Sequence, residues 1–131
     1  MSITFHPKAG AVLVCDFRGY IEPEIIKTRP VVVISPNHMR RPGLVAVIPL
    51  STTAPLHMEA YHYLLHGNPV PGSDAKVVWA KCDLVATVSI ERLDRKKVGR
   101  GRYAVGHVSM EQVRAMRRCA AISLGLELMN A

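Results

Sequence analysis

The chain has few aromatic residues, few cysteines and no long apolar run, and each shortage narrows what the protein can be. Aromatic residues make up 5% of its 131 residues, so a hydrophobic core must be built mainly from Val, Ile, Leu and Ala. No apolar stretch approaches the roughly 18–20 residues that a membrane-spanning helix needs. The N-terminal segment lacks a basic stretch followed by an apolar one, so we expect no signal peptide and a cytoplasmic protein.

The cysteines and histidines do not form a metal-binding pattern. Cys15, Cys82 and Cys119 are an odd number and lie far apart, and no CxxC pair occurs. Neither a disulfide framework nor a zinc site is indicated, and we expect buried, reduced thiols. Three histidines fall between His57 and His66, but no Cys or acidic residue completes a metal set at the usual spacing. We therefore predict no metal and no cofactor.

Positive charge is concentrated in the last third of the chain. The net charge is +7, and residues 92–118 contain nine basic and two acidic residues, which alone is +7. A localised basic patch is typical of a protein that binds nucleic acid or another polyanion, and a solvated surface is the ordinary alternative. The basic residues of this segment are Arg92, Arg95, Lys96, Lys97, Arg100, Arg102, Arg114, Arg117 and Arg118.

Short β-branched runs separated by turn residues predict one β-rich domain over residues 1–131. The run at 31–35 is unbroken, which favours a strand buried on both faces. Gly, Pro and charged residues at 18–28, 37–43 and 67–74 predict connections. The predicted strands cover residues 11–17, 31–35, 44–50, 60–65, 76–81 and 85–93.

One helix is predicted to end the domain. Ser109–Gln112 has the capping-box pattern, in which the Ser hydroxyl accepts from a backbone N–H and the Gln side chain reaches back. Arg114, Arg117 and Arg118 are expected on the polar side of this helix. Its apolar stripe consists of Val113, Met116, Ala120, Leu124 and Leu128. Strands followed by one helix predict a mainly β fold (α+β class), a small barrel with the helix over one opening.

Four blocks of sequence occur in a familiar order. They are Gly10 with Asp16-Phe17, then RPVVVISP at 29–36, then VIPLSTT at 47–53, and KCDLVATV at 81–88 with Arg92-Leu93 after it. Together they resemble the MazF/PemK (Kid-like) toxins, the ribonuclease halves of bacterial type II toxin–antitoxin pairs. The resemblance is weakest around 56–75 and 94–108. It implies an SH3-like barrel of the CcdB/MazF type, usually a homodimer.

The resemblance also implies an activity. Members are metal-independent endoribonucleases that cleave single-stranded RNA at short motifs and are neutralised by a cognate antitoxin. Cleavage without a metal requires deprotonation of a 2′-OH, stabilisation of the phosphorane and protonation of the 5′-oxygen. We expect products with 2′,3′-cyclic phosphate and 5′-OH ends.

Four residues are candidates for catalysis. Arg29 ranks first because its planar guanidinium can bind two phosphate oxygens at once; the alternative is an Arg paired with a carboxylate at a strand start. Ser51 and Thr52 can donate to phosphate oxygens, or they can hydrogen-bond their own turn. Asp83 is a candidate acid–base residue.

Four further residues are candidates for substrate binding. Lys81 and Asp83 are two residues apart in a predicted strand and should share one face, with a surface salt bridge as the alternative. Glu24 matches a loop glutamate of the family, which positions substrate or shapes the antitoxin groove, or is a solvated acid. Arg92 and Arg95 belong to the basic segment.

Two departures from the family pattern bear on specificity and rate. Pro23 replaces the Ser or His that precedes the loop glutamate, and Ala86 stands where many relatives carry Arg. The alternative function is a non-enzymatic barrel that binds nucleic acid or poisons DNA gyrase in the manner of CcdB. That class uses an apolar C-terminus containing Trp, whereas this chain ends in LGLELMNA.

Overall fold

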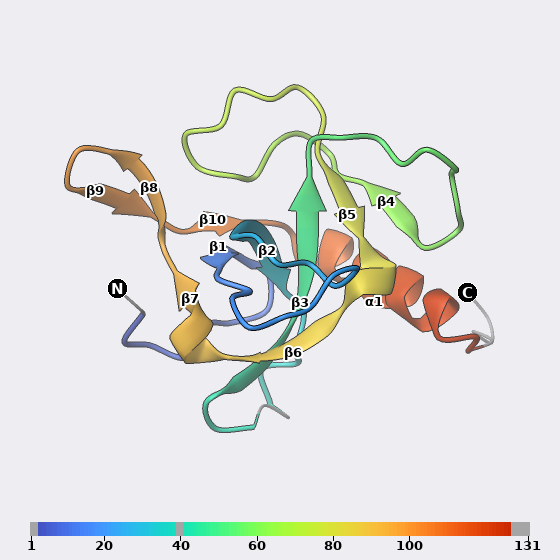
Figure 1. Cartoon of the computed structure of the whole chain (residues 1–131), viewed down its shortest axis with the longest axis horizontal. Coiled ribbons are helices and arrows are strands. Elements are labelled where there is room, and N and C mark those ends of the chain that lie inside the picture. The colour runs from blue at the N-terminus through green and yellow to red at the C-terminus, as the bar shows by residue number, and fades with distance from the viewer. Residues whose placement is uncertain (1–2, 39–40, 127–131) are drawn as a thin grey trace.

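The computed structural model describes residues 3–38 and 41–126, and its strands form a small barrel with one long helix beside it (Figure 1). The strands are β1 (Ala11–Cys15), β2 (Arg29–Val33), β3 (Leu44–Ser51), β4 (His62–Leu64), β5 (Trp79–Lys81), β6 (Ala86–Ser89), β7 (Leu93–Asp94), β8 (Lys96–Gly99), β9 (Arg102–Ala104) and β10 (Gly106–His107). The helices are η1 (Cys82–Leu84) and η2 (Ile90–Arg92), both 3₁₀, and α1 (Met110–Ser123).

The segment from β6 through η2 to β7 closes the barrel, because it pairs with β3 at its start and with β1 at its end. β1, β2 and β3 are antiparallel neighbours. β6 pairs with the first half of β3, and after η2 the chain reaches β1, where β7 pairs. β5 and β4 extend the sheet from the second half of β3. The predicted mainly β fold with a C-terminal helix is confirmed.

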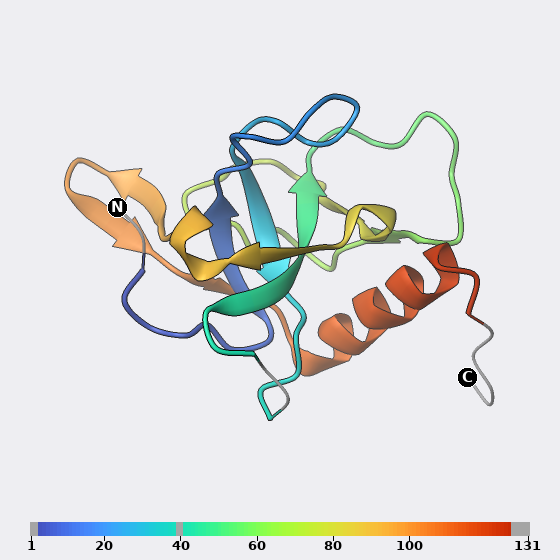
Figure 2. The same cartoon turned by 60° about the horizontal axis from the view of Figure 1, so that its bottom comes forward.

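The strands bury both of their faces, and this creates two cores. Alternate residues of β2 and β3, such as Val31, Val33 and Val47, fill the barrel interior. Val32 and Ile48 point the other way, into a second core that contains the apolar stripe of α1. The helix therefore covers an outer face of the sheet, as Figure 2 shows, and the expectation that it covers a barrel opening is wrong. Burial of β2 on both faces is confirmed, since Val31, Val32 and Val33 are each 0% exposed.

The helix begins as predicted, but its capping box is incomplete. The Ser109 hydroxyl accepts from the Gln112 N–H at 3.2 Å. The Gln112 side chain instead turns inward, where its Oε1 accepts from the His66 N–H at 2.9 Å and from the Tyr63 hydroxyl at 3.4 Å. Gln112 thus connects α1 to the chain at the end of β4. Because the side chain is buried, these hydrogen bonds satisfy its amide oxygen inside the protein.

The two faces of α1 also differ in detail from the prediction. Val113, Met116 and Ala120 are buried, whereas Leu124 ends the helix with 69% of its surface exposed. Arg117 does not lie on the solvent side, because its Nε donates to the Ile34 carbonyl at 2.8 Å. Leu128 falls outside the described residues. Within the described ranges, no helix has the length and apolar character to cross a membrane.

Some strand boundaries differ because local hydrogen bonds interrupt the chain. The predicted strand 85–93 breaks at η2, where the Ser89 hydroxyl accepts from the Glu91 N–H. The strand predicted over 76–81 begins only at Trp79. The β8–β9 hairpin and β10 were not predicted, because their basic residues and glycines do not alternate with apolar ones.

All three cysteines are free thiols, and the expectation that they are buried is wrong for Cys119, which is partly exposed. Cys15 and Cys82 are buried, and burial raises the pKa of Cys15 to about 12 and that of Cys82 further still. Burial also raises the pKa of Cys119, which is only partly covered.

Because the thiolate is the reactive form, we expect native protein at pH 8 to react slowly with iodoacetamide, and Cys119 to react before Cys15 and Cys82. Mass spectrometry of peptides from native and urea-unfolded protein measures this order. Rapid native labelling of Cys82 would contradict the packing described above.

Gly106 lies where β10 crosses beneath the 67–74 loop. A Cβ at this position would sit 2.1 Å from the Pro69 carbonyl oxygen and 3.1 Å from Val12 Cβ. Gly99 is a matched control, since a Cβ there would meet only the flexible Arg102 side chain, at 3.0 Å. We expect Gly106→Ala to lower the free energy of unfolding by about 2 kcal/mol through overpacking, and Gly99→Ala to change it by less than about 0.5 kcal/mol. Urea denaturation measures both; equal effects would contradict this packing.

Candidate functional site

Two of the candidate residues meet because neighbouring strands end at the same place. Arg29 is the first residue of β2, and Ser51 is the last residue of β3. The antiparallel register pairs Val31 with Pro49, so two further steps along each strand lead to Arg29 and Ser51. On the other side of β3, Ser51 pairs with Trp79, the first residue of β5. The sheet therefore brings the ends of β2, β3 and β5 together.

A cavity of about 560 Å³ lies at this meeting of strands, and we call it the central pocket. Three of its lining residues are cationic and four carry hydroxyl groups, while the lining contains no carboxylate among the described residues. Apolar residues from the second core form its floor. The lining consists of Arg29, Pro30, Leu50, Ser51, Thr52, Thr53, Val70, Ser73, Val78, Lys81 and Lys96.

Arg29 is exposed at the rim of this pocket. Among the described residues, its guanidinium makes no hydrogen bond or ion pair, so the alternative of an Arg held by a carboxylate is not what the structure shows. The planar group is available to bind an anion with two parallel hydrogen bonds.

Ser51 hydrogen-bonds its own turn, whereas Thr52 is exposed to the pocket; these are the two behaviours considered for hydroxyl residues at this position. Ser51 Oγ accepts from the Thr53 N–H at 3.1 Å and lies 3.4 Å from the Thr53 carbonyl oxygen, so it shapes its own turn. Thr52 is exposed beside it and lines the pocket. The 51–53 turn and Arg29 thus line the same pocket.

The expectation that Lys81 and Asp83 share one face of a strand is wrong. β5 ends at Lys81 and residues 82–84 form η1, so the two side chains do not alternate on a strand. Lys81 lines the central pocket, whereas Asp83 lines a separate hollow of about 240 Å³ with Phe17, Tyr20 and Glu24. The chain therefore places Asp83 apart from the cationic candidates.

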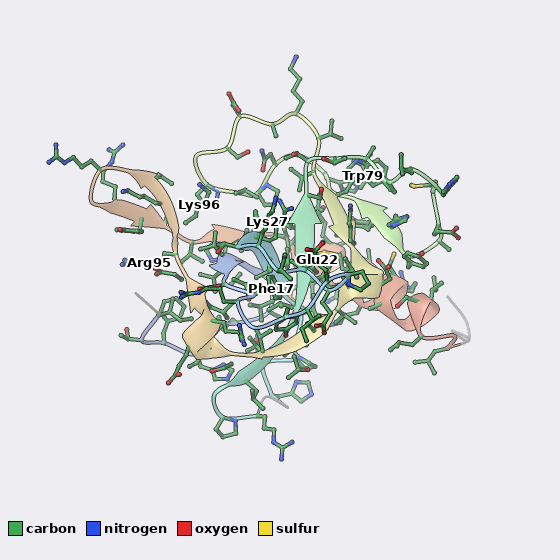
Figure 3. The ribbon with its side chains drawn as sticks, viewed as in Figure 1. Phe17, Glu22, Lys27, Trp79, Arg95 and Lys96 are labelled. Carbon is green, nitrogen blue, oxygen red and sulfur yellow. The ribbon has the colours of Figure 1, made fainter. Side chains whose placement is uncertain are left out.

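Glu24 holds the loop that precedes β2. Its Oε1 accepts from the Ile21 N–H at 2.7 Å, which closes a turn. Glu24 also lines a third hollow with Glu22, Lys27 and Arg29, so this hollow adjoins the central pocket at Arg29. Figure 3 shows Glu22 and Lys27 on the loop that crosses in front of the barrel.

The two arginines assigned to substrate binding have different surroundings. Arg92 Nη1 donates to the backbone carbonyls of Asp16 and Arg18 at 2.9 and 2.7 Å, and its guanidinium lies 5.2 Å from the Tyr20 ring centroid. Arg92 thus holds the 16–20 loop to the barrel. Arg95 is exposed on the hairpin side of the molecule, with its guanidinium 5.1 Å from the Tyr103 ring centroid.

The structure adds Lys96 to the site. It was counted in the basic segment but not singled out, because nothing in the sequence places β8 beside β2. Lys96 is half-buried and lines the central pocket with Arg29. In Figure 3 it lies on the side of the hairpin stem nearer β2, and Arg95 lies on the side away from it.

The basic segment is also divided by the fold. One part forms the β8–β9 hairpin, and the other places Arg114 and Arg118 on the exposed side of α1. Figures 1 and 2 place these two parts on different sides of the barrel. A single continuous basic face is therefore not formed.

Metal-binding geometry is not found in the part of the chain that the structure describes, where no three His, Cys, Asp or Glu residues are placed to hold one ion. Of the clustered histidines, His62 uses its Nδ1 to accept from the Glu59 N–H at 3.1 Å. This contact shapes the turn before β4.

The family of the chain follows from comparison with known proteins. A family model described as PemK-like, MazF-like toxin of type II toxin-antitoxin system matches residues 8–124. This chain belongs to that family. An alignment of 124 positions, which covers 77% of this chain and 80% of the relative, gives 35% identity to the uncharacterized protein YifN of Escherichia coli (strain K12).

Solved toxins of this family share the fold. MazF from Deinococcus radiodurans is similar with a TM-score of 0.64 at 18% identity, covering 93% of this chain and 99% of that one. A mycobacterial endoribonuclease, solved in complex with its cognate antitoxin, is similar with a TM-score of 0.62 at 21% identity, covering 94% and 99%. The predicted SH3-like barrel of the CcdB/MazF type is confirmed.

The different surroundings of Arg92 and Arg95 predict different effects of substitution. Arg92→Gln removes two hydrogen bonds to backbone carbonyls and should lower the free energy of unfolding by about 1–2 kcal/mol. Arg95→Gln should change it by less than about 0.5 kcal/mol, as for most surface substitutions. Urea denaturation of the two variants tests this difference, and the reverse order would contradict the assigned contacts.

Proposed function

We propose that this member of the MazF-like toxin family is a metal-independent endoribonuclease that cleaves single-stranded RNA, with the central pocket as its active site. The observation that carries the proposal is the gathering of Arg29, Lys81 and Lys96 around one cavity that also holds the Ser51–Thr53 turn. Such a set of donors suits a phosphodiester, because the charge that develops in the reaction resides on phosphate oxygens. Family membership and the endoribonucleases among its structural neighbours support the same function.

In the proposed reaction the RNA supplies its own nucleophile. The 2′-OH gives its proton to solvent, the 2′-oxygen attacks the adjacent phosphorus, and the bond to the 5′-oxygen breaks as that oxygen receives a proton, which leaves a 2′,3′-cyclic phosphate and a 5′-OH end. Arg29 binds two non-bridging oxygens and stabilises the dianionic phosphorane. Because guanidinium and ammonium groups donate but do not accept hydrogen bonds, the pocket stabilises charge and supplies protons rather than removing them.

The remaining residues have proposed roles that follow from their positions. Lys81 or Lys96 donates a proton or hydrogen bond to the leaving 5′-oxygen. Thr52 donates to a phosphate oxygen, and Ser51 holds the turn that positions Thr52. Asp83 and Glu24 lie outside the central pocket, so we assign them to substrate or partner recognition in their own hollow. Positive charge from side chains replaces that of a metal ion.

The proposed partners follow from the family. Antitoxin complexes occur among the structural neighbours, including MazE–MazF of Deinococcus radiodurans, and we propose that a cognate antitoxin neutralises this protein. We also propose a homodimer that acts on cytoplasmic mRNA and thereby inhibits translation and growth.

The Arg29→Ala variant tests the active site. It should lower the cleavage rate of single-stranded RNA about 10²–10³-fold, the loss that follows removal of one transition-state donor. Arg29→Lys should recover only part of the rate, since it keeps the charge and loses the two-point contact. Arg114→Ala on the exposed side of α1 is the matched control and should cleave like the wild type. Gel assays in excess EDTA, with unfolding curves for each variant, measure these effects.

The product ends separate cleavage from binding. The proposal predicts cleavage of single strands and not of duplexes, with ends that carry 5′-OH and cyclic or opened 3′-phosphate. If folded wild-type protein leaves varied single-stranded RNA intact with and without Mg²⁺, the enzymatic function is wrong. RNA binding without new ends would then identify a non-cleaving barrel.

A further inference from the structure

The β8–β9 hairpin is an excursion from the strand that closes the barrel. β7 pairs Asp94 with Val14, and β10 pairs Gly106 with Val12. Both lie on the edge of β1 that faces away from β2, so the chain leaves β1 after Asp94 and returns two residues farther along it. The hairpin forms a two-stranded sheet of its own, and neither of its strands pairs with a strand of the barrel (Figure 1). The residue types of the hairpin are therefore not required by closure of the barrel.

Those side chains are strongly basic. Residues 95–105 contain five Lys or Arg residues and no Asp or Glu. Like charges on so short an element repel one another and do not stabilise a two-stranded hairpin, which is marginal by itself. A local excess of one charge on a projecting element is the electrostatic signature of a polyanion-binding surface.

The hairpin has an outer face that combines cations with an aromatic ring. Lys97 is directly opposite Tyr103 in the register, and the Arg95 guanidinium lies 5.1 Å from the Tyr103 ring centroid. Tyr103 is 43% exposed. An exposed ring beside two cations is the arrangement with which proteins stack an unpaired base and bind its flanking phosphates.

The inner face of the hairpin is fixed against the active-site loops. Lys96 lines the central pocket, and its ammonium donates to the Lys97 carbonyl at 3.3 Å. Val98 packs on the 67–74 loop so closely that a Cβ on Gly72 would lie 3.2 Å from Val98 Cγ1. The hairpin is thus held at one end of the pocket. At the other end, beyond Arg29, the adjoining hollow contains Glu22 and Glu24, which repel a polyanion.

We propose that the outer face of the β8–β9 hairpin, formed by Arg95, Lys97 and Tyr103, is a second RNA-binding site that holds the nucleotides leaving the central pocket. This inference rests on the proposed function, because it takes the occupant of the pocket to be RNA. A flexible single strand can bend past Lys96 onto the outer face, whereas a stiff duplex cannot. Tyr103 stacks one base, and Arg95 and Lys97 bind phosphates.

Matched charge variants test the site. Arg95→Gln with Lys97→Gln removes two charges from the hairpin, and Arg114→Gln with Arg118→Gln removes two from the exposed side of α1. The probe is mixed-sequence 2′-O-methyl RNA, which lacks the nucleophile and is not cleaved. Fluorescence anisotropy over a range of salt concentrations gives both the affinity and its salt dependence.

The hairpin variant should bind the RNA about 10-fold more weakly. The slope of log K against log[salt] is negative, and it should become less steep by about 1.4, since each of the two lost phosphate contacts contributes about 0.7 for a single strand. The helix variant should bind like the wild type. Tyr103→Ala should weaken binding about 10-fold without changing the slope, because stacking is not a charge contact. Lys97→Gln with Arg100→Gln leaves the Arg95–Tyr103 contact in place and should still reduce the slope.

Equal affinities and slopes for the hairpin and helix variants would overturn the proposal. So would a hairpin variant that binds the RNA normally but loses affinity for poly-glutamate, since the hairpin would then recognise an acidic protein. Loss of binding in the hairpin variant, together with failure of the wild type to cleave unmodified RNA, would leave this site in place and remove the proposed enzymatic function.

Discussion

The barrel is closed by the segment from β6 to β7. Its first strand, β6, pairs with β3, and its last strand, β7, pairs with β1. This stretch turns at η2, where the Ser89 hydroxyl bends the chain between β6 and β7. Arg92, at the end of η2, then binds the backbone of the 16–20 loop. Inside this closed barrel, the antiparallel register of β2 and β3 makes the start of β2 coincide with the end of β3, and this places Arg29 next to the Ser51 turn. The site is a consequence of this register.

The fold also places the cationic and acidic candidates on different elements. The cationic side chains come from strand ends and from the hairpin stem, whereas Asp83 and Glu24 come from η1 and the loop before β2. A pocket lined by cations and hydroxyls attracts a phosphodiester, and the carboxylates of Glu22 and Glu24 lie only in the adjoining hollow beyond Arg29. The two cores hold this arrangement from both sides of the sheet, and Gln112 fixes α1 to the chain after β4.

Much of the fold and part of the site could be predicted from the sequence. The β-branched runs identified β1 to β3, and Ser109 marked the start of α1. Arg29, Ser51, Thr52 and Lys81 were named through motifs, and they line one pocket. Lys96 and the hairpin were missed, because a basic segment has no period and its neighbours depend on long-range pairing. Asp83 was misplaced since a 3₁₀ turn follows β5, which strand alternation does not reveal.

The most direct test of the central claim is a crystal structure of the protein with a single-stranded RNA that it recognises and that carries one 2′-deoxy nucleotide at the cleavage position. The account predicts the uncleaved phosphate in the central pocket, with two of its oxygens within hydrogen-bonding distance of the Arg29 guanidinium and Lys81 or Lys96 near the 5′-oxygen. An RNA bound with that phosphate in another hollow, or with Arg29 turned toward solvent, would contradict it.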